Sequence, residues 1–309
     1  MKTLKVQMLM AALVAILTAC AETPTIPAAG ASRDPRAPSF DRNAPTFEFT
    51  PIDIAGARST SAQGINADGD ISGLYVDANR RTHGFILHQG SVMTVDYPGA
   101  DYTDVRGIGP DGSVVGTFKH NGEESVAFHG FKRTPDGSFE AVHFPGHLYE
   151  IPQRILPDGT ILGCRHDHDL MGSMDGMEIA HADATEINQF ASMNNGAVPG
   201  ARLIVGLFTD MDTGSGEAYT IEDGVFRPFM VPGSVFTTAW DANARGDIAG
   251  VYSNTGTDFH GYVRTATGFT TIDAPGTSVT RVFGMNARGD VVGAYVANGV
   301  THGFLMSRR

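Results

Sequence analysis

The feature that most constrains the fold is a short segment that recurs six times along the chain. Its first copy reads GDISGLY from Gly69, and its last reads GDVVGAY from Gly289. A period near 44 residues is typical of the four-stranded blade of a β-propeller. The repeat therefore predicts one array of six units, numbered below in chain order. Their central glycines, spaced by 43, 47, 43, 44 and 43 residues, are Gly73, Gly116, Gly163, Gly206, Gly250 and Gly293.

Local residue patterns indicate strands rather than helices. In the first copy, Ile71, Gly73 and Tyr75 alternate with the residues between them, which is the two-residue period of a strand covered on both faces. An aromatic residue follows the central glycine by two positions in every unit except the third, which has Arg165. After the first 20 residues, no stretch with a 3.6-residue period exceeds about two turns. We therefore predict an all-β chain, a six-bladed β-propeller of four-stranded blades.

The two ends of the repeat region complement each other. Unit one divides into four strands, expected at 61–66, 69–76, 83–88 and 91–97, but the last unit ends after a third strand at 301–307. The N-terminal segment 47–54 has no preceding partner and resembles the outer strands of other units. We therefore expect it to pair with the C-terminal strands. This pairing would close the ring and remove the exposed sheet edges.

Residues 1–19 are predicted to be a lipoprotein signal peptide. Lys2 and Lys5 flank the start of an apolar stretch of signal-peptide length, which is too short for a comfortable membrane span of about 20 residues. The sequence Leu17-Thr18-Ala19-Cys20 resembles the lipobox of bacterial lipoproteins. This resemblance implies cleavage before Cys20 and a diacylglycerol group on its thiol, which would attach the chain to a membrane. The alternative is an ordinary secretory signal with an incidental cysteine.

The segment that follows is a tether, and the lipid rather than a basic patch would hold the chain to the membrane. Residues 20–45 contain five prolines and almost no large apolar residue, so they cannot bury enough surface to form a core. Because Ala21 rather than Asp follows Cys20, the lipoprotein resemblance implies export to the outer membrane or cell surface. The net charge of −12 argues against a nucleic-acid partner. Residues 46–309 are expected to form the single propeller domain.

A second motif, His-Gly followed by an aromatic residue, begins the third strand of four units. It reads His83-Gly84-Phe85, His129-Gly130-Phe131, His260-Gly261-Tyr262 and His302-Gly303-Phe304. Unit four carries Glu217-Ala218-Tyr219 in the place of this motif, and unit three has no clear equivalent. With Gly-Ile-Asn before it and Gly-Asp-Val-Val-Gly after it, the pattern resembles the HAF family of extracellular repeats, named for a His-Ala-Phe signature, over roughly residues 63–309. The resemblance implies export and a repeated β fold, and it implies no activity.

The histidines fall into two groups. The four repeated ones occupy the same place in successive units, so each is expected to hydrogen-bond the backbone or a turn within its own blade rather than share one ion. Unit three departs from the repeat with Arg165-His166-Asp167-His168-Asp169, where His166 and His168 could bind a divalent metal such as Zn²⁺. The alternative is a solvated loop with local charge pairing. No other cofactor is predicted, and Cys164 is expected to be buried and inert.

A ligand-binding face is expected where the inner strands begin. The only tryptophan, Trp240, is placed by the repeat alongside Gly64, Gly107 and Gly284 of other units. A tryptophan among polar residues suits sugar stacking or a protein contact, and the alternative is a plug that fills the channel. A GxGxxG match at 107–112 leads into a strand, so it is no dinucleotide site. The candidate residues of this face are Asp104, Arg106, Tyr149, Glu150, Trp240 and Arg281.

These observations predict a binding or interaction module of the cell envelope that recognises a protein or a glycan. The alternative is a hydrolase or lyase acting on polysaccharide, with Asp104, Glu150 or the 166–169 loop as acid–base groups. A cleft with two carboxylates about 5–10 Å apart would favour the enzyme. A purely structural envelope component is the third possibility. The ligand itself is not predicted.

Overall fold

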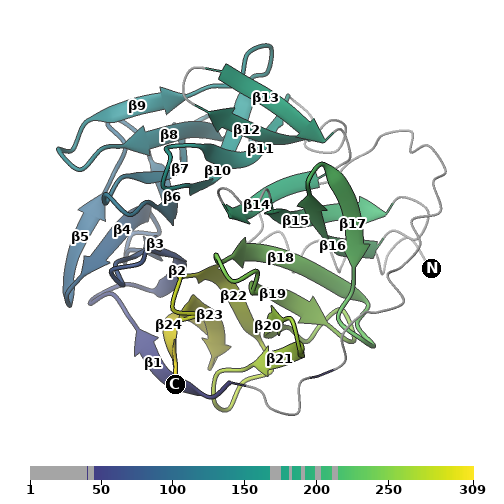
Figure 1. Ribbon diagram of the computed structural model, residues 1–309. Helices are drawn as coiled ribbons and strands as arrows, with labels where there is room; N and C mark the ends of the chain where they lie inside the picture. Colours follow the sequence, from purple (N-terminus) through teal and green to yellow (C-terminus); the bar gives the residue numbers. More distant parts are fainter. Residues whose placement is uncertain are drawn as a thin grey trace, which may run out of the picture.

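The computed structural model describes residues 40, 45–167, 175–180, 183–188, 192–198, 203–210 and 215–309. Within these ranges the regular structure is β throughout, with 24 strands and no α-helix. No helix in this part of the chain could therefore cross a membrane. Figure 1 shows the sheets set like blades around a central axis, so the chain is a β-propeller built of four-stranded blades, as predicted.

Counted outward from the axis, five units contribute an inner, a second, a third and an outer strand, and the N-terminal strand is the outer strand of the sixth. The strands nearest the axis are β2 (Ser59–Ile65), β6 (Tyr102–Ile108), β10 (Tyr149–Ile155), β14 (Ser192–Val198), β18 (Phe236–Ala242) and β22 (Thr280–Met285). The second strands are β3 (Ile71–Val76), β7 (Val114–Lys119), β11 (Ile161–His166), β15 (Leu203–Asp210), β19 (Ile248–Ser253) and β23 (Val291–Ala297). The third strands are β4 (Thr82–His88), β8 (His129–Arg133), β12 (Asp175–Ala180), β16 (Ser215–Glu222), β20 (His260–Thr265) and β24 (Val300–Arg308). The outer strands are β5 (Ser91–Val95), β9 (Phe139–Val142), β13 (Asp183–Asn188), β17 (Val225–Phe229), β21 (Gly268–Ile272) and β1 (Phe47–Ile52).

The sheets are antiparallel meanders. Strands β10–β13, β14–β17 and β18–β21 each form a four-stranded sheet, and β1 joins β22–β24 in a fourth. Strands β2–β9 form one eight-stranded sheet, in which β4 and β6 meet at the single parallel pair of Thr82 and Tyr102.

The N-terminal strand closes the molecule as predicted. Strand β1 runs antiparallel to β24 from the pair Phe47–Arg308 to the pair Ile52–Gly303. The outer edge of β24 is therefore covered by the other end of the chain, which leaves fewer unpaired backbone groups open to edge-to-edge association.

The repeated glycines are required by a close approach between neighbouring strands. A Cβ atom built on any of the six central glycines would lie 1.9–2.1 Å from a backbone carbonyl oxygen of the inner strand, for example 2.0 Å from that of Thr238 at Gly250. In the same blade the Tyr262 ring covers the other side of Gly250, at 2.8 Å from the same Cβ position. The motif that reveals the repeat is thus a steric requirement of the blade.

The repeated histidines are held within their own blades as predicted, but their partners are acidic side chains rather than backbone or turn groups. Each histidine ring nitrogen lies 2.8–3.0 Å from an acidic side chain of the same blade. Unit three has an equivalent that the sequence did not reveal, because Cys164 pairs with Gly176 as Leu74 pairs with Gly84. Asp175 then stands in the place of the histidine. The pairs are His83–Asp96, His129–Glu123, His260–Asp273 and His302–Asp53.

Candidate ligand-binding site

Every inner strand carries a β-bulge at the same position, and these bulges shape the axis. The pairing of β6 with β7, for example, skips Arg106 between Val105 and Gly107. A bulge turns the strand and re-aims its side chains. The bulged residues are Gln63, Arg106, Gln153, Asn195, Trp240 and Phe283.

The residue after each bulge is a glycine in four units and a charged residue in two. A Cβ atom at Gly107 would lie 2.8 Å from the carbonyl oxygen of Gln153 in the next inner strand, so the strands approach one another closely here. Units three and five instead place Arg154 and Asp241 at this position. The four glycines are Gly64, Gly107, Gly196 and Gly284.

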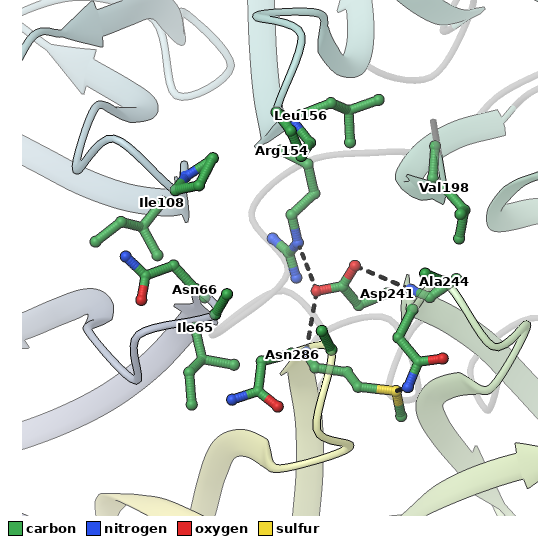
Figure 2. Close-up of a pocket in the computed structure, with 18 of the residues that line it drawn as sticks. Ile65, Asn66, Ile108, Arg154, Leu156, Val198, Asp241, Ala244 and Asn286 are labelled. Atoms are coloured by element: carbon green, nitrogen blue, oxygen red, sulfur yellow. Dashed lines mark hydrogen bonds and ion pairs between the residues drawn. The ribbon is translucent and has the colours of Figure 1, made fainter. Parts of the chain in front are cut away.

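Arg154 and Asp241 form a buried ion pair across the axis (Figure 2). The Arg154 Nε lies 3.1 Å from Asp241 Oδ2, and the two residues are only 7 % and 8 % exposed. A guanidinium has five N–H donors, and here each of them has an acceptor. The other four donate to the backbone carbonyls of Gln63, Arg106, Gln153 and Phe283. Arg154 on β10 thereby bonds to four other inner strands, β2, β6, β18 and β22.

The Asp241 carboxylate is equally well held. It accepts the backbone N–H groups of Ala242 at 2.9 Å and Met285 at 3.0 Å. Burial raises the pKa of Asp241, and the Arg154 guanidinium and the two N–H groups oppose that rise. The pair is thus neutral as a unit and satisfied by the protein itself.

A cavity of about 360 Å³ opens where the inner strands end, and we call it the turn-side cavity. Figure 2 looks into it, with Arg154 and Asp241 at its centre and Ile65, Ile108 and Val198 around them. The ends of the inner strands supply its apolar wall: Ile65, Ile108, Ile155, Val198, Ala242 and Met285. Its only charged lining residues in the described part of the chain are the Arg154–Asp241 pair.

A second cavity, of about 180 Å³, lies at the opposite end of the inner strands and is called the crossover-side cavity. In β2, Ser59, Thr60, Ser61 and Gln63 line this cavity, whereas Gly64 and Ile65 line the turn-side cavity. The bulges therefore stand between the two. The crossover-side wall includes Gln63, Tyr102, Asp104, Arg106, Trp240, Phe283 and Thr301.

Asp104 and Arg106 form a buried ion pair in the crossover-side cavity. The Arg106 Nε lies 2.8 Å from Asp104 Oδ2, and the hydroxyl of Tyr102 is 3.5 Å from the same oxygen. Burial raises the pKa of Asp104, and the neighbouring Arg106 guanidinium opposes that rise. Asp104 is only 1 % exposed, yet its Oδ1 has no hydrogen-bond partner among the described residues.

Trp240 also lies in the crossover-side cavity, but its place in the repeat differs from the one that the sequence predicts. The ring stands edge-on to Phe283 at 5.3 Å between centroids. It occupies the bulge and is the counterpart of Arg106, not of Gly107, because the extra residue shifts the alignment by one. Trp240 is 3 % exposed, and its Nε1–H has no acceptor in the described part of the chain.

Three of the six predicted face residues meet in this cavity, and Tyr149, Glu150 and Arg281 line neither cavity. The Arg281 guanidinium lies over the Phe259 ring at 4.3 Å, and burial lowers its pKa to about 10. Glu150 accepts the backbone N–H of Phe144 six residues earlier. The same bond is made elsewhere by a threonine hydroxyl, at Thr60, Thr103, Thr237 and Thr280. Glu150 therefore has a structural role.

The predicted metal site can be placed only in part. His166 is fully buried on β11, with Nδ1 3.0 Å from the carbonyl oxygen of Asp167, and burial lowers its pKa. His168 lies outside the described residues, as does Cys20. The described ranges hold no group of three or more His, Cys, Asp or Glu residues placed to bind a metal. Cys164 is buried as predicted, and burial raises its pKa to about 12.

Two residues of the axis were missed by sequence reasoning. Arg154 and Asp241 have opposite charges and stand where four other units have glycine, so the repeat itself carried the signal. The one-residue bulge hid it, because the equivalent positions align only once the bulge is counted.

Comparison with known proteins supports the fold and nothing more specific. No family model and no curated protein matches the chain, so the HAF resemblance stays an expectation. TolB from Acinetobacter baumannii is 15 % identical with a TM-score of 0.53, over 77 % of this chain and 64 % of that one. Trypanosoma rangeli sialidase is 8 % identical with a TM-score of 0.51, over 85 % and 60 %. The lectin SapL1 is 9 % identical with a TM-score of 0.50, over 77 % and 88 %. The chain thus spans less than two thirds of the TolB and sialidase chains, and it is similar to all three in fold.

Proposed function

We propose that the chain is a binding module of the cell envelope whose ligand occupies the crossover-side cavity. The observation that carries this proposal is that two buried atoms, Asp104 Oδ1 and Trp240 Nε1, have no hydrogen-bond partner among the described residues. Leaving a buried polar group unpaired costs about 1–3 kcal/mol, and a ligand that pairs it recovers this free energy. The turn-side cavity is larger, but the charged pair at its centre is already satisfied.

Binding is favoured over the alternative of a hydrolase or lyase acting on polysaccharide. Glycoside hydrolysis generally uses two carboxyl groups about 5–10 Å apart. Among the described residues, Asp104 is the only carboxylate that lines the crossover-side cavity. The Glu150 carboxylate pairs with His143 and accepts the backbone N–H of Phe144. Asp241 lines the turn-side cavity instead.

We further propose that the ring has six blades. The inner strands of the six units contact one another in sequence, and β22 returns to β2. The eight-stranded sheet divides at the one parallel pair of Thr82 and Tyr102, which leaves two four-stranded meanders. All six units also carry the same bulge, which is expected of six equivalent blades.

A membrane anchor at Cys20 is compatible with a ligand site in the crossover-side cavity. Strand β1 begins at Phe47, opposite Arg308 at the end of β24. In an antiparallel meander this end of β24 lies with the end of β22, beside the turn-side cavity. A tether over residues 20–45 would therefore reach the propeller on the turn side, and the crossover-side cavity would open away from the membrane.

Replacing Cys20 with serine should release the protein from the membrane. The thiol is the atom that would carry the lipid, and the acidic chain has no basic patch to substitute for it. Fractionation of cells and labelling with a radioactive fatty acid measure the effect. Cys164→Ser is the matched control and should keep both the label and the membrane location. Equal labelling of wild type and Cys20→Ser would contradict the anchor.

A photo-crosslinking residue at Thr301 should capture a ligand in cells, whereas the same residue at Ala287 should not. Both positions belong to the last unit, and Thr301 lines the crossover-side cavity while Ala287 lines the turn-side cavity. Adducts are detected by mass spectrometry of the purified protein. Introducing Trp240→Phe should reduce the Thr301 adduct. Adducts at Ala287 alone would place the ligand in the wrong cavity and overturn the proposal.

A further inference from the structure

We propose that the ligand is an uncharged polyhydroxylated unit, a single sugar ring at the end of a glycan, which rests on the proposed function of the crossover-side cavity. The two atoms require opposite hydrogen-bonding groups from a ligand, one a donor and the other an acceptor. Asp104 Oδ1 can only accept a hydrogen bond when ionised, and Trp240 Nε1–H can only donate one. A hydroxyl group both donates and accepts, so a ring that carries several hydroxyls can match an acceptor and a donor in the same cavity.

Charged ligands fit this cavity poorly. Among the described residues its lining has one acidic and one basic side chain, Asp104 and Arg106, and these already neutralise each other at 2.8 Å. A carboxylate ligand would accept from Trp240 but would bring a second negative charge beside Asp104. An ammonium group would donate to Asp104 but would offer nothing to Trp240 and would face Arg106. Burying either charge without a partner of its own costs far more than burying a hydroxyl.

The wall of the cavity suits the two kinds of surface that a sugar presents. Trp240, Phe283 and Tyr102 supply aromatic rings for its C–H groups. The remaining polar lining is largely neutral hydroxyls and an amide. These residues are Ser59, Thr60, Ser61, Gln63, Thr82 and Thr301.

The cavity is small. Pockets for drug-sized ligands generally measure about 300–1,000 Å³, and this cavity of about 180 Å³ is smaller. We therefore take one ring to be the part of the ligand that enters it. A longer glycan would therefore insert its terminal unit and leave the rest outside.

Titration of the full chain, solubilised in a sugar-free detergent, with a panel of methyl glycosides tests the ligand class. The panel contains neutral hexosides and deoxyhexosides, a methyl glucuronide as the acidic member and a methyl glucosaminide as the cationic member. We expect saturable binding of at least one neutral glycoside, and binding of the charged members at least tenfold weaker. Saturation-transfer NMR and calorimetry both report the result.

Two variants link binding to the proposed contacts. Trp240→Phe keeps an aromatic ring and removes the N–H donor, so affinity should fall about tenfold, which corresponds to about 1.4 kcal/mol. Thr301→Trp enlarges a half-buried residue of the cavity wall and should block the site without altering the axis. Ile108→Val in the turn-side cavity is the control and should bind like wild type. Thermal melting checks that each variant is folded.

The outcomes separate the ligand class from the site. An adduct at Thr301 in cells together with no binding of any neutral glycoside, or with tighter binding of a charged member, would overturn the sugar proposal and leave the binding site standing. Neutral-glycoside binding that survives Thr301→Trp would overturn the placement in this cavity. Loss of binding in Thr301→Trp and retention in Ile108→Val would support both.

Discussion

Replacing Arg154 with methionine should lower the free energy of unfolding by about 3–5 kcal/mol. The substitution leaves the Asp241 carboxylate buried with no opposite charge, and it removes the donors from four backbone carbonyls of the inner strands. Removing one partner of a buried ion pair is much more costly than removing both. Denaturant unfolding of the purified protein at neutral pH measures the change.

Two further variants test the reason for this effect. Arg154→Met combined with Asp241→Leu should recover part of the loss, because no uncompensated charge remains, although the carbonyls still lack their donors. Arg227→Met is the control, since Arg227 is half exposed and its ion pair with Glu222 contributes little. If Arg154→Met lowered the free energy of unfolding no more than Arg227→Met, the Arg154–Asp241 ion pair would not stabilise the ring.

Gly250→Ala should destabilise the protein by about 3 kcal/mol or prevent it from folding, because the added methyl group cannot be placed without separating two strands. It would lie 2.0 Å from the carbonyl oxygen of Thr238 on one side and 2.8 Å from the Tyr262 ring on the other. A backbone carbonyl cannot move aside as a flexible side chain can. Soluble yield and thermal melting measure the loss.

A turn glycine provides the matched comparison. Gly224 has a φ of +78°, and a methyl group added there would meet no atom within 4 Å. Alanine at this position therefore costs only the strain of the left-handed conformation, about 1–2 kcal/mol. The strand glycine should be clearly the more sensitive of the two. Equal losses at both positions would mean that the close approach between β18 and β19 is not what requires glycine.

The sequence predicts this fold well because its determinants are local and repeated. Alternation along 69–76 and the glycine at its centre both express the packing of a strand between two neighbours. The pairing of β1 with β24 was predictable for a different reason, since the last unit lacked a strand and the N-terminal segment resembled one.

The candidate site was less predictable because a bulge has no fixed residue signature. Asp104 and Arg106 were expected on an inner strand and do meet Trp240 in one cavity. Their unpaired atoms depend on how the inner strands converge, which local patterns do not determine. The position of Glu150 at the start of an inner strand predicts it on the same face, although it takes over the hydrogen bond of a recurring threonine.

The pairing of β1 with β24 also dictates the order in which the propeller can be completed. His302 bonds to Asp53, a residue 249 positions earlier, across the same seam. Of the strands in the described part of the chain, β1 leaves the ribosome first and its partner leaves last. The blades between them can form from contacts close in sequence, whereas the final one waits for β24. A propeller built in this way cannot close its ring before its last strand is made.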